Sequence, residues 1–111
     1  MNILIYNFED YTFDDLESFS KQVESVTFFA FSHEDVRITI KNRNIDKVIF
    51  RIISEDDLEL LENIRKHNKD IEFLVLFSDY TKYPDFENSK WYSDDIKLTE
   101  LSEAICGWRR I

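Results

Sequence analysis

Apolar residues along this chain gather in short continuous runs rather than in alternating patterns. Five mainly apolar segments that contain such runs lie at residues 3–6, 26–31, 47–53, 71–77 and 91–92. Continuous apolar runs of this length are typical of strands that are buried on both faces of a sheet. The pattern therefore predicts five strands, each covered on two sides.

The stretches between the first runs begin with a repeated signal for a helix start. A hydroxyl residue followed three positions later by an aspartate occurs at Thr12, Ser32 and Ser54. Such a hydroxyl caps the first turn, and the carboxylate can bond back to the cap residue. Apolar residues at steps of three and four then predict helices within 13–23, 36–40, 58–64 and 98–108. Residues 37–40 also alternate as a strand would, but the cap at Ser32 favours a helix.

The segment at 78–90 differs from the rest of the chain. It is polar, contains the only proline and holds one helical turn at most. Elsewhere strand and helix patterns alternate, which predicts a parallel sheet covered by helices on both faces. We therefore expect an α/β fold of one domain over residues 1–111, with a flavodoxin-like, doubly wound, five-stranded parallel sheet. Its fourth helix is shortened or lost.

Composition excludes several classes of protein. Hydrophobic residues make up 43% of the chain, enough for a core without disulfides or metals, and a single glycine leaves no glycine-rich phosphate loop. The formal net charge of −9 opposes binding to nucleic acid by this domain alone. No apolar run approaches the roughly 20 residues of a membrane span, and no basic leader precedes the first strand, so we expect a cytoplasmic location.

Residue types that carry catalysis are few and scattered. The only cysteine, Cys106, excludes an internal disulfide and a multi-cysteine metal site, and it fits a small apolar position on a helix. His33 lies beside a cap and His67 at a helix end, so both are expected at the surface. Neither histidine pairs with Cys106 or a serine in a recognisable nucleophile arrangement. The sequence therefore predicts no enzyme activity and no cofactor.

The segment 32–51, SHEDVRITIKNRNIDKVIFR, resembles the second helix and third strand of a response-regulator receiver domain. Receivers have paired acids before that helix, here Glu34 and Asp35, and an aspartate opening the strand, here Asp46. The segment 58–65 resembles the third helix of receivers, and 70–76 resembles the fourth strand. The resemblance covers nearly the whole chain and implies bacterial two-component signalling.

The resemblance breaks down at the positions that carry phosphoryl chemistry. Receivers hold Mg²⁺ with carboxylates after the first strand, and they end the third strand in the acceptor aspartate, the fourth in a hydroxyl and the fifth in a lysine. This chain has Asn7 and Phe8 in place of the carboxylates and Arg51 in place of the acceptor aspartate. It has Phe77 in place of the hydroxyl residue and Asp94 in place of the lysine. The resemblance therefore implies a degenerate, or pseudo-receiver, domain without a metal site.

Charged residues near these positions suggest two further features. Arg51 and Asp94 stand where receivers place an acid and a lysine, so the signs are exchanged, and an ion pair between them would join the two strand ends. Glu9, Asp10, Asp79, Asp94 and Asp95 all follow predicted strands and should gather at one edge. That rim is either a solvated surface or a rebuilt cation site of a cation-binding enzyme. The positive charge of Arg51 among these acids favours the solvated surface.

Aromatic residues crowd the short polar segment and the fifth strand. They are Tyr80, Tyr83, Phe86, Trp91 and Tyr92. Trp91 falls near the position of the switch aromatic of receivers. Aromatics are enriched at protein interfaces, so these residues form a candidate interaction face, together with Lys97, Glu100 and Arg109 on the last helix. The alternative is that the rings fill the space left by the shortened fourth helix.

Together these features predict a phosphorylation-independent, receiver-like regulatory module. It would act through protein–protein interaction, with a second copy of the chain as one candidate partner, and without nucleic acid or membrane. Two alternatives stay open. The chain is the N-terminal regulatory domain of a longer response regulator or transcription factor, or it is a small acidic inhibitor of the immunity-protein type that covers a basic enzyme.

Overall fold

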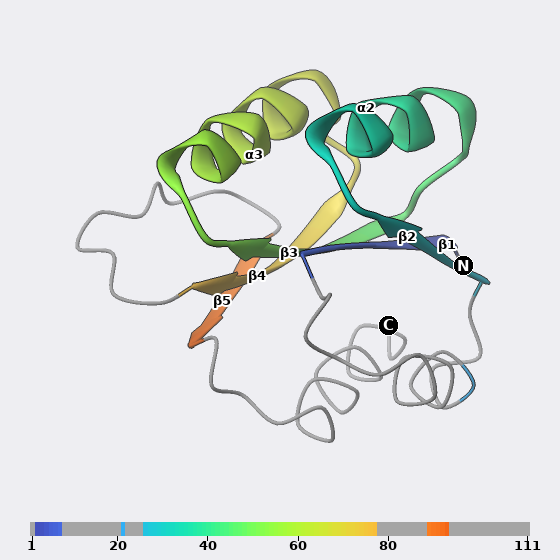
Figure 1. Ribbon diagram of the computed structural model, residues 1–111. Coiled ribbons are helices and arrows are strands. Elements are labelled where there is room, and N and C mark those ends of the chain that lie inside the picture. Colours follow the sequence, from blue (N-terminus) through green and yellow to red (C-terminus); the bar gives the residue numbers. More distant parts are fainter. Residues whose placement is uncertain (1, 8–20, 22–25, 78–88, 94–111) are drawn as a thin grey trace.

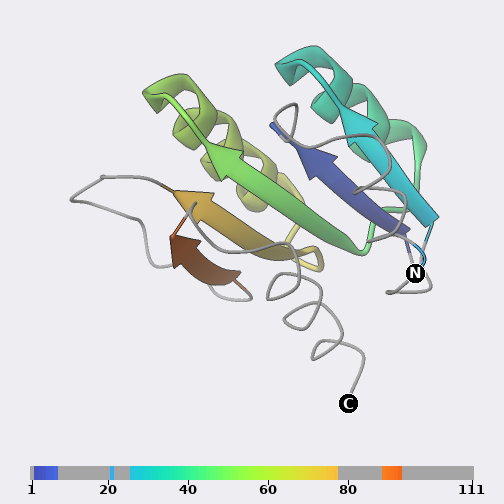
Figure 2. The same cartoon turned by 60° about the horizontal axis from the view of Figure 1, so that its bottom comes forward.

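A parallel β-sheet with two helices on one face makes up the described part of the chain (Figure 1). The computed structural model describes residues 2–7, 21, 26–77 and 89–93, and only the backbone of 90–93. The strands are β1 (Asn2–Tyr6), β2 (Val26–Ala30), β3 (Lys47–Ile52), β4 (Glu72–Phe77) and β5 (Ser89–Ser93). They pair in parallel in the order β2-β1-β3-β4-β5, and their common direction is visible in Figure 2. The predicted α/β class with a parallel sheet is confirmed, and the order is that of flavodoxin-like sheets.

The two described helices are α2 (His33–Asn42) and α3 (Glu55–His67), which lie beside each other on the same face of the sheet (Figure 1). The Oγ of Ser32 accepts a hydrogen bond from the backbone N–H of Asp35 at 3.1 Å, as the cap signal predicts. Because this cap starts a regular helix, the alternative strand assignment for 37–40 is wrong. None of the helices in the described ranges is long and apolar enough to cross a membrane.

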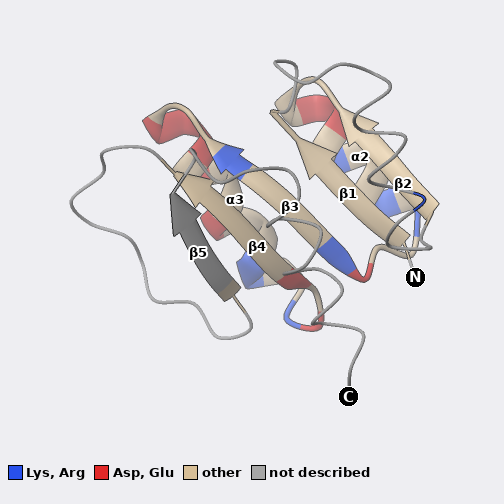
Figure 3. Ribbon diagram, turned by 90° about the horizontal axis from the view of Figure 1, so that it is seen from below, with Lys and Arg blue, Asp and Glu red and all other residues tan. Residues whose placement is uncertain are grey.

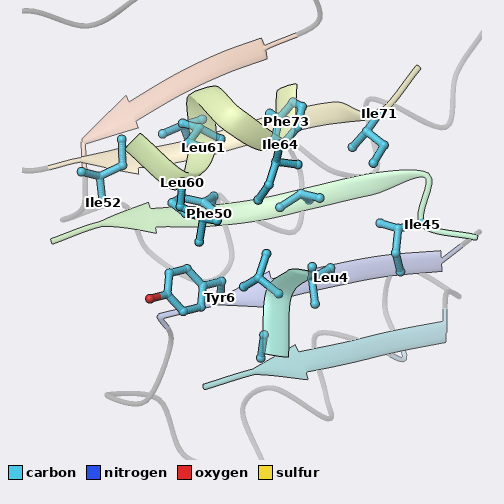
Figure 4. Close-up of a cluster of buried hydrophobic side chains, with 14 residues drawn as sticks. Leu4, Tyr6, Ile45, Phe50, Ile52, Leu60, Leu61, Ile64, Ile71 and Phe73 are labelled. Atoms are coloured by element: carbon cyan, nitrogen blue, oxygen red, sulfur yellow. The ribbon is translucent and has the colours of Figure 1, made fainter. Parts of the chain in front are cut away.

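The core that these helices cover lies between them and the sheet (Figure 4). Its buried members are Leu4, Tyr6, Ala30, Val36, Ile45, Val48, Phe50, Ile52, Leu60, Leu61, Ile64, Ile71, Phe73 and Val75. In the strands these residues alternate with others that point to the opposite face, since side chains in a strand alternate. The alternating set is also buried, at 2% exposure or less: Ile3, Ile5, Ile49, Leu74 and Leu76. The expectation that the strands are covered on both faces is confirmed for β1, β3 and β4, whereas β2 is partly exposed.

The ends of the predicted strands need small corrections. Phe31 and Ile53 lie outside β2 and β3, and their side chains are 66% and 59% exposed. At both places the chain leaves the sheet to enter the cap of the following helix, at Ser32 and Ser54. β4 begins one residue after the expected start, at Glu72, and the strand expected at 91–92 lies within β5. The helices expected at 13–23 and 98–108, and the segment 78–88, fall outside the described residues apart from Lys21.

Polar contacts hold the amino-terminal edge of the sheet, where the central strands begin. The backbone N–H of Asn2 donates to Asp46 Oδ2 at 2.8 Å, which joins the start of β1 to the residue before β3. The buried ammonium of Lys47 pairs with Glu72, its register partner on β4. A buried charge is costly unless it is paired, so this ion pair accounts for Lys47 structurally.

Candidate functional site

The carboxyl-terminal edge of the sheet contains a buried polar network, which begins where β1 ends. Asn7 follows β1 with a left-handed backbone, at φ 67°. Asparagine tolerates this conformation better than most residues because its short side chain can bond locally. Its Nδ2 donates to the backbone oxygen of Arg51 at 2.9 Å and to Asp57 Oδ2 at 3.1 Å. The turn after β1 is thereby attached to β3 and to α3.

Asp57 enters the network from the first turn of α3. Its Oδ2 accepts hydrogen bonds from the backbone N–H groups of Ile53 and Ser54, at 3.0 and 3.2 Å. The bond to Ser54 is the carboxylate half of the predicted cap, which is confirmed. Because the cap directly follows β3, it places this carboxylate at the sheet edge, where it is 4% exposed.

Tyr6 and His33 reach the other carboxylate oxygen. Asp57 Oδ1 accepts from the hydroxyl of Tyr6 at 3.0 Å and lies 2.8 Å from His33 Nε2. The Tyr6 ring packs against Phe50 in the core, while its hydroxyl points toward the carboxyl ends of the strands (Figure 4). The rings of Tyr6 and His33 meet edge to face, with centroids 5.8 Å apart. The site therefore joins β1, α2 and α3 through one carboxylate.

We call Tyr6, Asn7, His33, Ile53, Ser54 and Asp57 the Asp57 network. Burial acts to raise the pKa of the Asp57 carboxyl, but hydrogen bonds from His33, the Ile53 N–H, Tyr6 and the Ser54 N–H outweigh burial and leave the pKa below its usual value. The carboxylate is therefore ionised at neutral pH. Since an ionised carboxylate only accepts hydrogen bonds, His33 Nε2 carries the hydrogen in this contact.

The number of donors around Asp57 limits what it can do chemically. A carboxylate offers about four lone-pair sites. Two donors meet Oδ1 and three meet Oδ2. The carboxylate is thus fully engaged by the protein itself, which leaves no oxygen lone pair directed at a cation or at an incoming phosphoryl group.

The predicted phosphorylation-site positions fall partly within the described residues. Asn7 and Arg51 lie together at the ends of β1 and β3, and they are joined by the bond to the Arg51 carbonyl. Phe77 is the last residue of β4 and is half-buried. Phe8 and Asp94 lie outside the described residues, and with Asp94 the proposed ion pair to Arg51. Figure 3 shows a basic residue toward each end of β3, which are Lys47 and Arg51.

The expectation that His33 lies at the surface is wrong. Its ring is half-buried because Nε2 turns inward to the Asp57 carboxylate. His67 is exposed, as expected. The sequence pattern predicted only a capping role for Asp57, with no contact to Tyr6. The available signal was the cap position itself, because a carboxylate three residues after a strand-ending cap must lie at the carboxyl edge.

Other candidate residues cannot be placed in this site. Glu9, Asp10, Asp79 and Asp95 of the predicted rim, and Tyr80, Tyr83 and Phe86 of the predicted interaction face, lie outside the described residues. For Trp91 and Tyr92 only the backbone of β5 is described. Within the ranges that are described, no group of three or more His, Cys, Asp and Glu side chains is placed to hold a metal ion.

Solved structures supply the comparison that the sequence alone does not. No protein-family model matches the chain, and no curated protein matches it. The chain is similar to a response regulator from Thermotoga maritima, with 16% identity over 94% of this chain and 92% of that one and a TM-score of 0.73. It is also similar to a response-regulator receiver domain from Bacillus halodurans, with 13% identity over 100% and 97% of the two chains and a TM-score of 0.76.

The fold is that of a receiver domain. A third similar structure is NtrX from Brucella abortus, with 17% identity and a TM-score of 0.64. That match covers 96% of this chain but 26% of NtrX. The receiver-like fold therefore also occurs as one part of a longer protein.

Proposed function

We propose that this chain is a phosphorylation-independent, receiver-like regulatory module that acts by binding a protein partner. In this proposal the complete domain is doubly wound, with helices on both faces of a five-stranded sheet. The receiver-like fold supports a signalling role, and the residues at the carboxyl edge support a role without phosphoryl transfer. No cofactor, metal or catalytic residue takes part.

The observation that carries the proposal is the set of residues found at the carboxyl edge of the sheet. The end of β3 presents Arg51, and the turn after β1 presents an amide, Asn7, in place of a metal-binding carboxylate. The one buried carboxylate at this edge, among the described residues, is Asp57, and protein donors occupy both of its oxygens. Phosphoryl transfer depends on an open acceptor and on a metal ion that neutralises the phosphate charge, and the described residues of this edge offer no open acceptor and no carboxylate free to bind Mg²⁺.

The test is exposure of the purified protein to small phosphodonors. Incubation with acetyl phosphate and Mg²⁺, or with beryllofluoride and Mg²⁺, should leave the intact mass and the amide spectrum unchanged. A receiver domain that accepts phosphate from acetyl phosphate serves as positive control in the same buffer. Detection of a phosphoaspartyl adduct, or of Mg²⁺-dependent shifts at residues 7, 51 or 57, would overturn the proposal.

A second candidate is that the chain regulates an effector region of the same polypeptide, which the match to part of NtrX favours. In that case the partner surface of this domain would face its own effector region. Sequencing the gene beyond the codon for Ile111 tests this candidate. A reading frame that continues into an effector domain supports it, and a stop codon at that point contradicts it.

A further inference from the structure

A groove of about 390 Å³ lies between α2 and α3, apart from the Asp57 network. It occupies the side of the two-helix layer where both helices end. It is lined by Arg37, Ile40 and Lys41 of α2 and by Asn63, Ile64 and His67 of α3. Asn68, the residue after α3, completes the lining. None of these residues has a part in the function proposed above.

The groove is basic although the chain is acidic. Arg37, Lys41 and His67 line it and no Asp or Glu does, in a chain of formal net charge −9. Arg37 and Lys41 are one helical turn apart, so their side chains share a face of α2. Among the described residues, neither Arg37 nor Lys41 forms an ion pair. Basic residues near helix ends complement the helix dipole, but that effect does not require them to face one groove.

The uncharged lining shows what kind of ligand fits. Ile64 is buried and Ile40 is half-buried, so the floor of the groove is apolar. The side chain of Asn63 offers both a donor and an acceptor, as peptide groups require. His67 Nδ1 donates to the Asn63 backbone oxygen at 2.9 Å, which leaves Nε2 to meet a ligand.

These features favour a peptide over a compact anion. A phosphate or sulfate group would use only the donors and would leave the apolar floor of Ile40 and Ile64 uncovered. A peptide with spaced carboxylates and apolar side chains would use the basic groups, the apolar floor and the amide together. Binding of an amphipathic segment in a groove with an apolar floor is a recurring mode of peptide recognition.

We propose that the α2–α3 groove binds an acidic, amphipathic segment of a partner protein. Carboxylates of the segment pair with Arg37 and Lys41, and its apolar side chains lie on Ile40 and Ile64. This inference rests on the proposed function, because it names the partner chemistry of a module that acts by binding protein.

The experiment uses a fluorescein-labelled peptide of repeating Glu-Glu-Leu-Leu units as the probe. Fluorescence anisotropy should show saturable binding that weakens with added salt, and amide shifts should concentrate at residues 37–41 and 63–68. Arg37→Glu and Lys41→Glu should each weaken binding by about fivefold or more, because each exchanges an attraction for a repulsion.

Lys66→Glu is the matched control, since Lys66 is an exposed residue in the last turn of α3 that does not line the groove. It should leave binding unchanged. The inference is overturned if the probe does not bind, if Lys66→Glu weakens binding as much as Arg37→Glu, or if a Gln-Gln-Leu-Leu peptide binds equally well. None of these results changes the outcome expected in the phosphodonor test. A phosphoaspartyl adduct together with normal peptide binding would overturn only the proposed function.

Discussion

Replacing Asp57 by asparagine tests whether the Asp57 network holds the carboxyl edge together. The substitution keeps the shape of the side chain but removes its charge and turns one acceptor oxygen into an NH₂ donor. The least damaging orientation keeps the amide oxygen toward Asn7, Ile53 and Ser54, where three donors converge. The NH₂ group then faces Tyr6 and His33, which at present donate to Asp57.

The expected loss follows from these contacts. A hydrogen bond to a charged group contributes about 1.5–3 kcal/mol and a neutral one about 1 kcal/mol. Asp57→Asn weakens three bonds in this way and forces two others to rearrange. The free energy of unfolding should therefore fall by about 2–4 kcal/mol in total. For a domain of this size the melting temperature should fall by roughly 4 °C for each kcal/mol lost.

Urea denaturation followed by circular dichroism measures the free energy of unfolding. The matched control is Asp56→Asn, which removes the neighbouring carboxylate from the same turn of α3, where it is exposed. Only a favourable interaction with the helix dipole is lost there, about 0.3–1 kcal/mol. If Asp57→Asn and Asp56→Asn destabilise the protein equally, the five contacts to Asp57 do not act as described.

Two further predictions concern the same network. Tyr6→Phe keeps the ring against Phe50 but removes one bond to the carboxylate, so the free energy of unfolding should fall by about 1–2 kcal/mol, and an unchanged urea midpoint would show that this bond contributes nothing. The folded-state pKa of Asp57 is lowered from 3.8, so its ionised carboxylate stabilises the folded protein. This contribution to the free energy of unfolding is complete above pH 3.8 and is lost as the pH falls below that value toward the folded-state pKa. Acid titration of stability should therefore show a steeper loss below about pH 4 for the wild type than for Asp57→Asn, and parallel curves would contradict the assignment.

The strands β1, β3 and β4 were predictable from sequence because they are buried on both faces. A strand in that position favours apolar residues at successive sites, as in 73–77, and such a run stands out in a chain with 33% charged residues. The helix starts at Ser32 and Ser54 were predictable for a local reason, since the cap and its carboxylate are three residues apart in the chain. Strand ends were less certain, because Phe31 and Ile53 are apolar residues that the structure leaves exposed.

The Asp57 network was missed because its contacts are distant in sequence. Tyr6 and His33 are 51 and 24 residues from Asp57, and no local pattern links them. The position of His33 beside a cap suggested an exposed side chain, but the ring turns toward the sheet edge, where a buried carboxylate accepts its hydrogen. Only the strand order, which places β1 between β2 and β3, brings these residues together.

The Asp57 network also determines whether Asp57 itself could serve as a phosphoryl acceptor. A phosphoryl acceptor needs an oxygen with a free lone pair and a cation close by. Asp57 would have to release Tyr6, His33 or Asn7 to provide one, and release of the buried Tyr6 hydroxyl would cost about 1–3 kcal/mol. It would also disturb the start of α3, which the same carboxylate caps through Ser54. A carboxylate with these structural contacts favours a fixed carboxyl edge over an open phosphoryl site, which agrees with the function proposed above.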